Sequence, residues 1–135
     1  MAVDAWVDTN VILRYLLRDN EELFAAAAQV MTKAEHGEVN LHLTPLTVAE
    51  VVWVLESFYD YPREQVAEVV GTFATVGGII LEERETVLQA LADYASLNVD
   101  FVDAYLAAKA AATGWPVCTF DKKDFDRLPA KKFTI

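Results

Sequence analysis

Acidic side chains stand just beyond the apolar segments of this 135-residue chain, where they could act together. Asp8 follows the first apolar segment, Glu50 lies one turn into the helix expected after the second, and Asp121 follows a later one. Asp100 and Asp103 begin another expected helix, and their spacing of three puts them on one face. Two carboxylates about 4 Å apart repel by about 4 kcal/mol at an effective dielectric near 20. The pattern therefore predicts either a bound cation or an acid that is pushed toward its protonated form.

A hard divalent cation is the simplest partner for such a set of carboxylates. Cys118 is the only cysteine, and His36 and His42 do not fall at a metal-ligand spacing, so the candidate donors are oxygen atoms. Oxygen donors favour magnesium or manganese. Magnesium keeps several of its waters, and one of them can serve as a nucleophile while the cation screens a phosphate. This chemistry suits the hydrolysis of a phosphodiester bond.

Glu50 is the most informative of these acids. A single aspartate after a strand is also a common helix cap or turn residue, so each aspartate has an ordinary structural explanation. Glu50 fits such an explanation least well, because its neighbours one helical turn away are Leu46, Trp53 and Val54. We therefore expect Glu50 to face the apolar side of its helix, where a lone carboxylate is costly unless it is paired or binds a cation.

The elements that must position these acids alternate between strand and helix. Apolar runs predict strands at residues 2–7, 39–44, 79–81 and 115–120, with a short last strand at 133–135. Helical spacing predicts helices at 11–17, 21–35, 46–59, 86–97 and 101–113, with another that starts at Pro62, and a polar turn is expected at 121–126. We predict a single domain over residues 1–135 with an α/β fold, a three-layer α/β/α arrangement around a parallel sheet of about five strands. Chemistry in such sheets lies beyond the carboxyl ends of the strands.

Charge is distributed unevenly along the chain, whose net charge is −10. Residues 1–100 carry 17 acidic and 5 basic side chains, whereas residues 101–135 carry 4 acidic and 6 basic ones. The bulk charge would repel nucleic acid, so a polyanionic substrate must be held by a local basic patch or by bound cations. The candidates for that patch are Lys109, Lys122, Lys123, Arg127, Lys131 and Lys132, together with Arg14 and Arg18.

The sequence shows neither a membrane span nor a signal peptide. Its longest apolar run, at 69–81, is shorter than a bilayer requires and contains Gly71, Gly77 and Gly78. Asp4 and Asp8 stand where a signal peptide would need basic and then apolar residues. We therefore expect a cytoplasmic protein without membrane attachment.

Taken in order, the acidic motifs resemble those of the PIN-domain ribonucleases, and most closely those of the VapC-type toxins of toxin–antitoxin pairs. The resemblance covers nearly the whole chain. The segments that carry it are Val7-Asp8-Thr9-Asn10-Val11, Pro45-Leu46-Thr47-Val48-Ala49-Glu50-Val51-Val52-Trp53-Val54-Leu55, Asp100-Phe101-Val102-Asp103-Ala104 and Thr119-Phe120-Asp121.

The resemblance implies a metal-dependent endoribonuclease that cuts RNA, often transfer RNA, with a metal-activated water. It implies an acidic pocket for Mg²⁺ or Mn²⁺. The core acidic positions of the family match Asp8, Glu50, Asp103 and Asp121, with Asp100 as an auxiliary acid. Asp8 and Asp103 would be the most direct metal ligands, with Asp100 and Asp121 also in the metal set. Thr9, Asn10 and Thr119 would position water or phosphate. Asp124 lies in a turn that varies within the family and is not part of this set.

The resemblance also implies a homodimer and a cognate antitoxin, a segment of which lies in a groove of the toxin. An apolar surface that would suit such a segment carries Val51, Trp53, Val54, Leu55, Phe58 and Tyr59, although these residues also suit an ordinary core. The alternative function is a catalytically idle PIN-like domain that binds protein or RNA. A phosphatase acting on a small phosphate ester is a third possibility, but position 10, where it would need a second acid, is Asn10.

Overall fold

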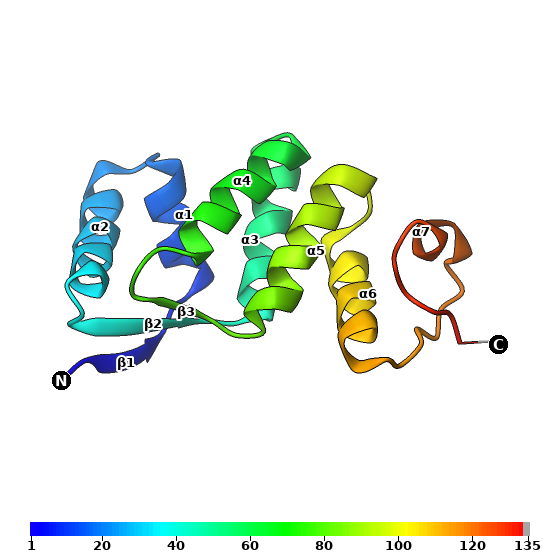
Figure 1. The fold of residues 1–135 in the computed structure, drawn as a ribbon. Coiled ribbons are helices and arrows are strands. Elements are labelled where there is room, and N and C mark those ends of the chain that lie inside the picture. The colour runs from blue at the N-terminus through cyan, green and yellow to red at the C-terminus, as the bar shows by residue number, and fades with distance from the viewer. Residues whose placement is uncertain (134–135) are drawn as a thin grey trace.

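The computed structural model describes residues 1–133 and joins a small parallel sheet to seven helices (Figure 1). In chain order the elements are β1 (Val3–Trp6), α1 (Thr9–Leu17), α2 (Glu21–Glu35), β2 (Val39–Leu43), α3 (Pro45–Ser57), α4 (Arg63–Ala74), β3 (Ile79–Leu81), α5 (Arg84–Leu97), α6 (Phe101–Thr113) and α7 (Lys122–Asp126). The elements expected between residues 2 and 113 are confirmed, with small shifts in their bounds. No helix in this described range is long and apolar enough to cross a membrane.

The sheet has one covered face and one bare face. Its strands pair in parallel in the order β1-β2-β3, with Ala5 beside Leu41 and Leu41 beside Ile79. Helices α1 to α5 lie above the strands in Figure 1, and the strand residues buried on that side are Leu41, Leu43, Ile79 and Leu81. The opposite face carries the partly or fully exposed residues Asp4, Trp6, Asn40, His42 and Ile80.

Two expectations about the sheet are therefore wrong for the part of the chain that the structure describes. The sheet has three strands rather than about five, and helices cover one of its faces rather than both. The α/β class and the parallel pairing are confirmed. Short, apolar strands indicated a doubly covered sheet, but β1 exposes Val3 and Trp6 instead of burying them.

Local signals explain why the helices begin where they do. The side chain of Asn20 accepts a hydrogen bond from the Leu23 N–H (3.0 Å) at the start of α2. Thr44 caps α3 in the same way through the Thr47 N–H (3.1 Å), and Pro45 occupies the first turn, where its missing N–H costs nothing. Both starts could be located from the sequence because capping is a contact between near neighbours.

The body of the molecule is packed closely around the sheet. Gly78 precedes β3 with a φ of +91°, and a Cβ there would lie 2.4 Å from the carbonyl oxygen of Ala34 in α2. Only glycine lets the chain turn into β3 at this distance from the α2 backbone. The Gly78 carbonyl then accepts the Leu41 N–H (2.8 Å), which ties the turn to β2.

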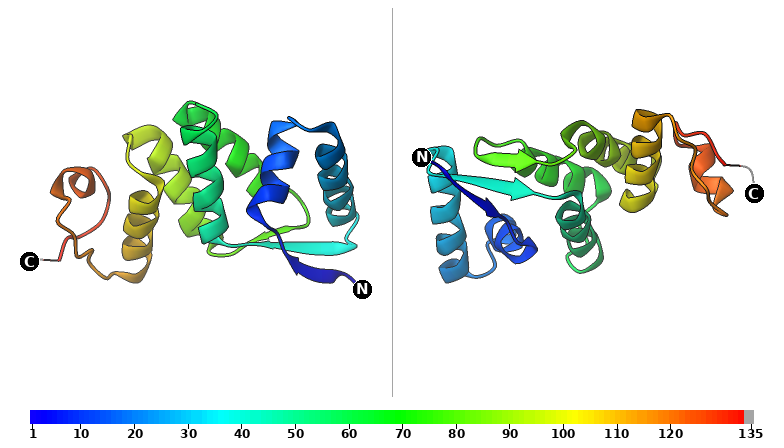
Figure 2. Two further views of the ribbon diagram at one scale, coloured as in Figure 1. Left: turned by 180° about the vertical axis from the view of Figure 1, so that it is seen from behind. Right: turned by 90° about the horizontal axis from the view of Figure 1, so that it is seen from below.

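The segment after α6 lies apart from the sheet. Figures 1 and 2 show β1 and α7 at opposite ends of the molecule, with α3, α4 and α5 between them. Residues 115–120 therefore do not form the expected strand, because no sheet edge is near enough to pair with them. Within this segment Val117 makes an isolated parallel bridge to Lys132.

Two smaller expectations at the end of the chain also change. The region expected to be a polar turn, 121–126, is mostly the short helix α7. Phe133 is not part of a strand, and the rest of the last expected strand lies outside the described residues. The segment is anchored by the buried side chains of Val117, Phe125 and Leu128.

Candidate functional site

Asp103 is placed by the first turn of α6. Asp100 is the N-cap of this helix, with extended backbone angles (φ −60°, ψ 144°). Phe101 and Ala104 on either side of Asp103 are buried, and α6 packs extensively against α5. This packing fixes the first turn of α6, so Asp103 is held partly buried beside the end of that interface.

Asp121 and Asp124 are placed by short-range hydrogen bonds. The Asp121 N–H donates to the hydroxyl oxygen of Thr119 (2.9 Å), which shapes the turn before α7. The Asp121 carboxylate in turn accepts the Asp124 N–H (3.1 Å) as the N-cap of α7. Phe125 is buried, and the Arg127 guanidinium donates to the Leu97 carbonyl at the end of α5 (2.9 Å). These contacts dock α7 against the body of the molecule.

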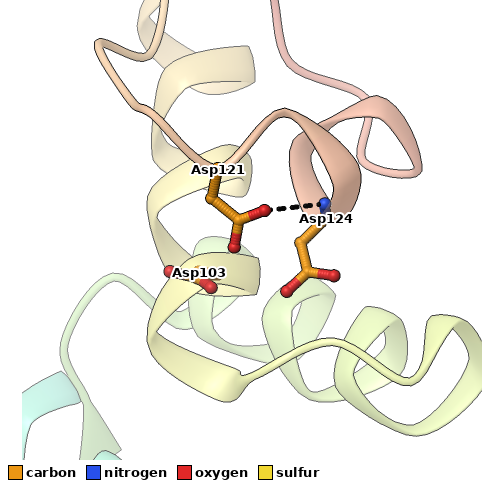
Figure 3. Close-up of side chains that lie close together, drawn as sticks. All are labelled: Asp103, Asp121 and Asp124. Carbon is orange, nitrogen blue, oxygen red and sulfur yellow. Dashed lines mark hydrogen bonds between the residues drawn. The ribbon is translucent and has the colours of Figure 1, made fainter.

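The three aspartates converge on one point. One carboxylate oxygen from each of Asp103, Asp121 and Asp124 lies within 4.8 Å of the other two. Figure 3 shows Asp121 and Asp124 directed from α7 and its preceding turn toward Asp103 on α6. Partial burial, together with the negative charges of Asp100, Asp121 and Asp124, raises the pKa of Asp103 above its ordinary value of 3.8. The proton is held more tightly because burial and three like charges both disfavour the ionised carboxylate.

This donor set fits a hard divalent cation. Carboxylate oxygens from two elements face a common point, and a cation placed there would remove the repulsion that raises the pKa of Asp103. Asp124 already has one cationic partner, since it forms an ion pair with Arg127. Asp103 and Asp121 are therefore the stronger candidates for direct ligands, and Asp124 would have to share its carboxylate between Arg127 and the ion.

Glu50 and Asp100 line a separate depression next to this group. The pocket has a volume of about 320 Å³ and is lined mainly by apolar side chains of α3 and by the start of α6, among them Leu46, Trp53 and Phe101. The expectation that Glu50 faces an apolar interior is wrong, because Glu50 itself is exposed. Its apolar neighbours are also on the surface, since Leu46 is 80% and Trp53 57% exposed.

Asp8, Thr9 and Asn10 lie where β1 leads into α1. Asp8 is the N-cap residue of α1, but its exposed side chain makes no capping hydrogen bond. Thr9 is buried, and the Asn10 side chain accepts a hydrogen bond from the Arg14 guanidinium (3.3 Å). Asp8 is not part of the group formed by Asp103, Asp121 and Asp124. The expectation that all the acids share one edge of the sheet is wrong for this arrangement of the described residues.

The sequence interpretation left out Asp124, which the structure adds to the group. A signal for it was present, because Asp121 and Asp124 have the i, i+3 spacing of an N-cap and a first-turn acid. The short segment looked like a turn, and a turn gives no reason to direct two carboxylates the same way. Once residues 122–126 are helical, the spacing places both on the side that faces α6.

Comparison with known proteins gives one match. The family model described as PIN domain matches residues 5–131. The search of curated proteins and the search of solved structures each return no match. The matched range includes Asp8, Glu50, Asp100, Asp103, Asp121 and Asp124.

Proposed function

The chain belongs to the PIN-domain family, whose members are in general metal-dependent nucleases, and from this premise we propose that it is a Mg²⁺- or Mn²⁺-dependent endoribonuclease. It hydrolyses phosphodiester bonds of RNA, with transfer RNA as the first substrate to test. The observation that carries the proposal is the convergence of Asp103, Asp121 and Asp124 within 4.8 Å inside the matched range.

In this proposal the chain's own residues hold the ion and orient the RNA. A divalent cation, when bound, lowers the pKa of a coordinated water and screens the charge of a phosphate. Asp103 and Asp121 would hold the ion through their ionised carboxylates. The hydrogen bond from the Asp121 N–H to the Thr119 hydroxyl shapes the turn that directs the Asp121 carboxylate toward it. Lys122 and Lys123 are exposed next to Asp121, so they can contact phosphates that approach the site. Their charge offsets the repulsion expected from a chain with a net charge of −10.

We further propose that the enzyme is the toxin of a cytoplasmic toxin–antitoxin pair of the VapC type and that it works as a homodimer. The support for an antitoxin contact is the pocket beside α3, which combines exposed Leu46 and Trp53 with the acidic side chains of Glu50 and Asp100. An antitoxin segment with apolar side chains and one basic residue would match both features. Bound there, it would lie at the start of α6, close to Asp103.

The test is cleavage of total transfer RNA by purified protein, free of any co-purified partner, in magnesium, manganese or EDTA. We expect discrete fragments with either metal, no cleavage in EDTA, and no cleavage by Asp103→Asn. The matched control is Asp126→Asn, which removes an exposed acid of α7 that pairs with Lys132 outside the cluster. Fragments that persist in EDTA, or equal activity of Asp103→Asn, would contradict the proposal.

A second candidate function is an idle PIN-like domain that binds RNA or protein. The observation that favours it is the separation of Asp8 from the Asp103 group, since an idle domain has no need to join them. Such a domain would bind RNA with the same affinity in EDTA and in magnesium and would leave it intact. Cleavage that depends on both the metal and Asp103 rejects this alternative.

A further inference from the structure

Arg63 lies where its own helix does not favour a basic residue. It is the first residue of α4, and the dipole of a helix disfavours a cation at the N-terminus. Its guanidinium instead reaches the C-terminal end of α5, where a helix dipole favours positive charge. There it donates to the carbonyl oxygens of Tyr94 (3.4 Å) and Val99. The contacts that explain the position of Arg63 are therefore those to α5 and to the turn that follows it.

The turn between α5 and α6 depends on such a partner. Residues 98–100 alone join the two helices, and Asn98 turns the chain with a left-handed φ of +53°. Val99 is buried (1% exposed), and no backbone N–H within residues 1–133 donates to its carbonyl. A buried carbonyl without a donor is costly, so the Arg63 guanidinium satisfies a group that the backbone leaves unpaired.

Two further contacts fix the Arg63 guanidinium. It lies over the ring of Tyr94, 4.6 Å from the ring centroid, and pairs with the Glu56 carboxylate of α3 (3.5 Å). The Tyr94 hydroxyl donates to the same carboxylate. Burial, together with the Glu56 carboxylate, raises the pKa of Tyr94, so this hydroxyl keeps its proton at neutral pH. Residues of α3 and α5 thus hold a planar guanidinium in one orientation, which the ammonium group of a lysine would not reproduce.

We propose that Arg63 is a positioning residue for the acidic group. By holding the Val99 carbonyl it sets the first turn of α6 and so places Asp103 against the other two aspartates. Asp100 follows Val99 as the N-cap of α6, and Asp103 lies in the turn that begins there. The Asp100 side chain makes no capping hydrogen bond, so the start of α6 relies on contacts from outside the helix. A role in RNA cleavage rests on the proposed nuclease function, whereas a role in metal binding does not.

A second arginine binds the same end of α5 from α7. Arg127 donates to the Leu97 carbonyl (2.9 Å) and pairs with Asp124. Guanidinium groups therefore link the last turn of α5 and the turn after it to α4 and to α7. Arg63 acts on the segment that leads to Asp103, and Arg127 acts on the helix that carries Asp124. The approach of the two carboxylates depends on both arginines, but only Arg63 does so without contacting the acidic group itself.

The first measurement is the affinity for Mn²⁺ without RNA, from the electron paramagnetic resonance signal of free Mn²⁺ added to protein stripped of metal. We expect Arg63→Met, which keeps an apolar stem but loses the donors, to weaken binding by about 10-fold, as for residues that support a metal ligand. Arg63→Lys keeps one donor for the Val99 carbonyl and should recover part of the affinity. The matched control is Arg84→Met, which removes the same charge from an exposed position at the start of α5 and should bind Mn²⁺ as wild type does.

The second measurement separates positioning from a general loss of stability. Initial rates of transfer RNA cleavage are recorded over a range of Mn²⁺ concentrations. Loss of a positioning residue should raise the Mn²⁺ concentration for the half-maximal rate by about 10-fold and leave the rate at saturating Mn²⁺ within about twofold of wild type. A residue that serves only stability would change neither value while the protein is folded. Far-ultraviolet circular dichroism at the assay temperature checks the fold of each variant.

Arg63→Met that folds and binds Mn²⁺ with wild-type affinity would overturn the proposal. If Arg63→Met does not fold, Arg63→Lys and Glu56→Gln decide. Glu56→Gln keeps an acceptor for the Tyr94 hydroxyl but removes the charge that pairs with Arg63. Wild-type affinity in both of these variants would also overturn it. Wild type that binds Mn²⁺ more tightly than the Arg63 variants but cuts no RNA rejects the nuclease proposal and leaves the positioning role standing. Wild type that binds no Mn²⁺ overturns both.

Discussion

The two ends of the molecule present their acidic residues in different ways. At the α6–α7 end Asp103, Asp121 and Asp124 converge within 4.8 Å, and hydrogen bonds from Asp121 and Asp124 backbone N–H groups hold the turn. Where β1 leads into α1, Asp8 is exposed and its side chain makes no capping hydrogen bond, and no strand within residues 1–133 pairs with the outer edge of β1. One end is an assembled group of carboxylates, and the other is a single carboxylate beside an unfinished sheet.

This difference shows which contacts a short segment can form within itself and which need a distant part of the chain. The bonds that hold Asp121 and Asp124 join residues two and three positions apart, so closing them costs little chain entropy. A strand pairing between β1 and residues 115–120 would join positions about 110 residues apart, and such contacts form only when the intervening elements allow them. Local contacts therefore position Asp121 and Asp124, whereas only long-range contacts can bring Asp8 close to them.

The largest expected effect compares how tightly the chain is packed at Gly78, next to the sheet, and at Gly114, at the end of α6. Gly78 and Gly114 both have positive φ (+91° and +78°), but only at Gly78 would a Cβ meet another backbone, at 2.4 Å from the Ala34 oxygen. We expect Gly78→Ala to lower the free energy of unfolding by about 3 kcal/mol or more, since strain and overpacking add. Gly114→Ala should lower it by about 1 kcal/mol, from backbone strain alone. Urea unfolding measures both, and equal losses would mean that the two regions are packed alike.

Sequence reasoning found most of the fold where local signals decide it. The helices predicted at 21–35 and 46–59 start within one residue of α2 and α3, whose first turns are held by contacts of Asn20 and Thr44 over three residues. Residues 115–120 have strand-like composition, but a strand needs an edge to pair with, and composition does not say whether one is within reach. The number of strands and the number of layers were wrong for this reason.

The residues of the candidate site also differ in whether local sequence patterns could predict their positions. Asp103 and Asp121 were identified from their motifs, and the structure brings them together. Asp124 was missed, because it depends on a short helix that looked like a turn. Burial of Glu50 was inferred from Leu46 and Trp53, but apolar neighbours indicate burial only if they are themselves covered, and both are exposed. Whether Asp8 acts with Asp103 is a question of long-range pairing that motif spacing does not address.

The next effect asks whether the two ends act as one site. We expect Asp8→Asn and Asp121→Asn to reduce the rate of RNA cleavage equally, each by more than about 100-fold. Each change would remove a carboxylate that binds the metal, and this costs more than losing a residue that only supports such a ligand, which typically costs about 10- to 100-fold. Initial rates with labelled transfer RNA in manganese measure this, with Asp126→Asn as the control that stays near wild type. If Asp8→Asn keeps wild-type activity while Asp121→Asn loses it, the α6–α7 group works alone and the two ends are independent.

Metal binding to Asp103, Asp121 and Asp124 should give a smaller change, in the stability of the folded protein. At ten times its dissociation constant, Mn²⁺ should stabilise the folded protein by about 1.4 kcal/mol and raise its melting temperature by a few degrees. Thermal unfolding with added MnCl₂, against NaCl at equal ionic strength, measures the shift. Asp103→Asn should lose it and Asp126→Asn should keep it. A shift that survives Asp103→Asn would place the ion outside the group of Asp103, Asp121 and Asp124.

The smallest effect is the pH dependence of the free energy of unfolding in EDTA. It shows whether Asp103, Asp121 and Asp124 form a cation site or an acidic group that supports the fold. Burial and the charges of Asp100, Asp121 and Asp124 raise the pKa of Asp103 above 3.8, so the folded protein binds this proton more tightly than the unfolded chain does. The resulting stabilisation is complete below pH 3.8 and is lost as the pH rises through the raised pKa. Asp103→Asn carries no such charge, so at pH 7 it should be as stable as wild type or more stable, by less than about 1 kcal/mol because the site is partly exposed to solvent. Urea unfolding of both proteins between pH 4 and pH 7 measures the difference, which should grow in favour of the variant with pH. A variant that is less stable than wild type at pH 7 would show that the charge of Asp103 supports the fold. The group of Asp103, Asp121 and Asp124 would then have a structural role and would not be a cation site.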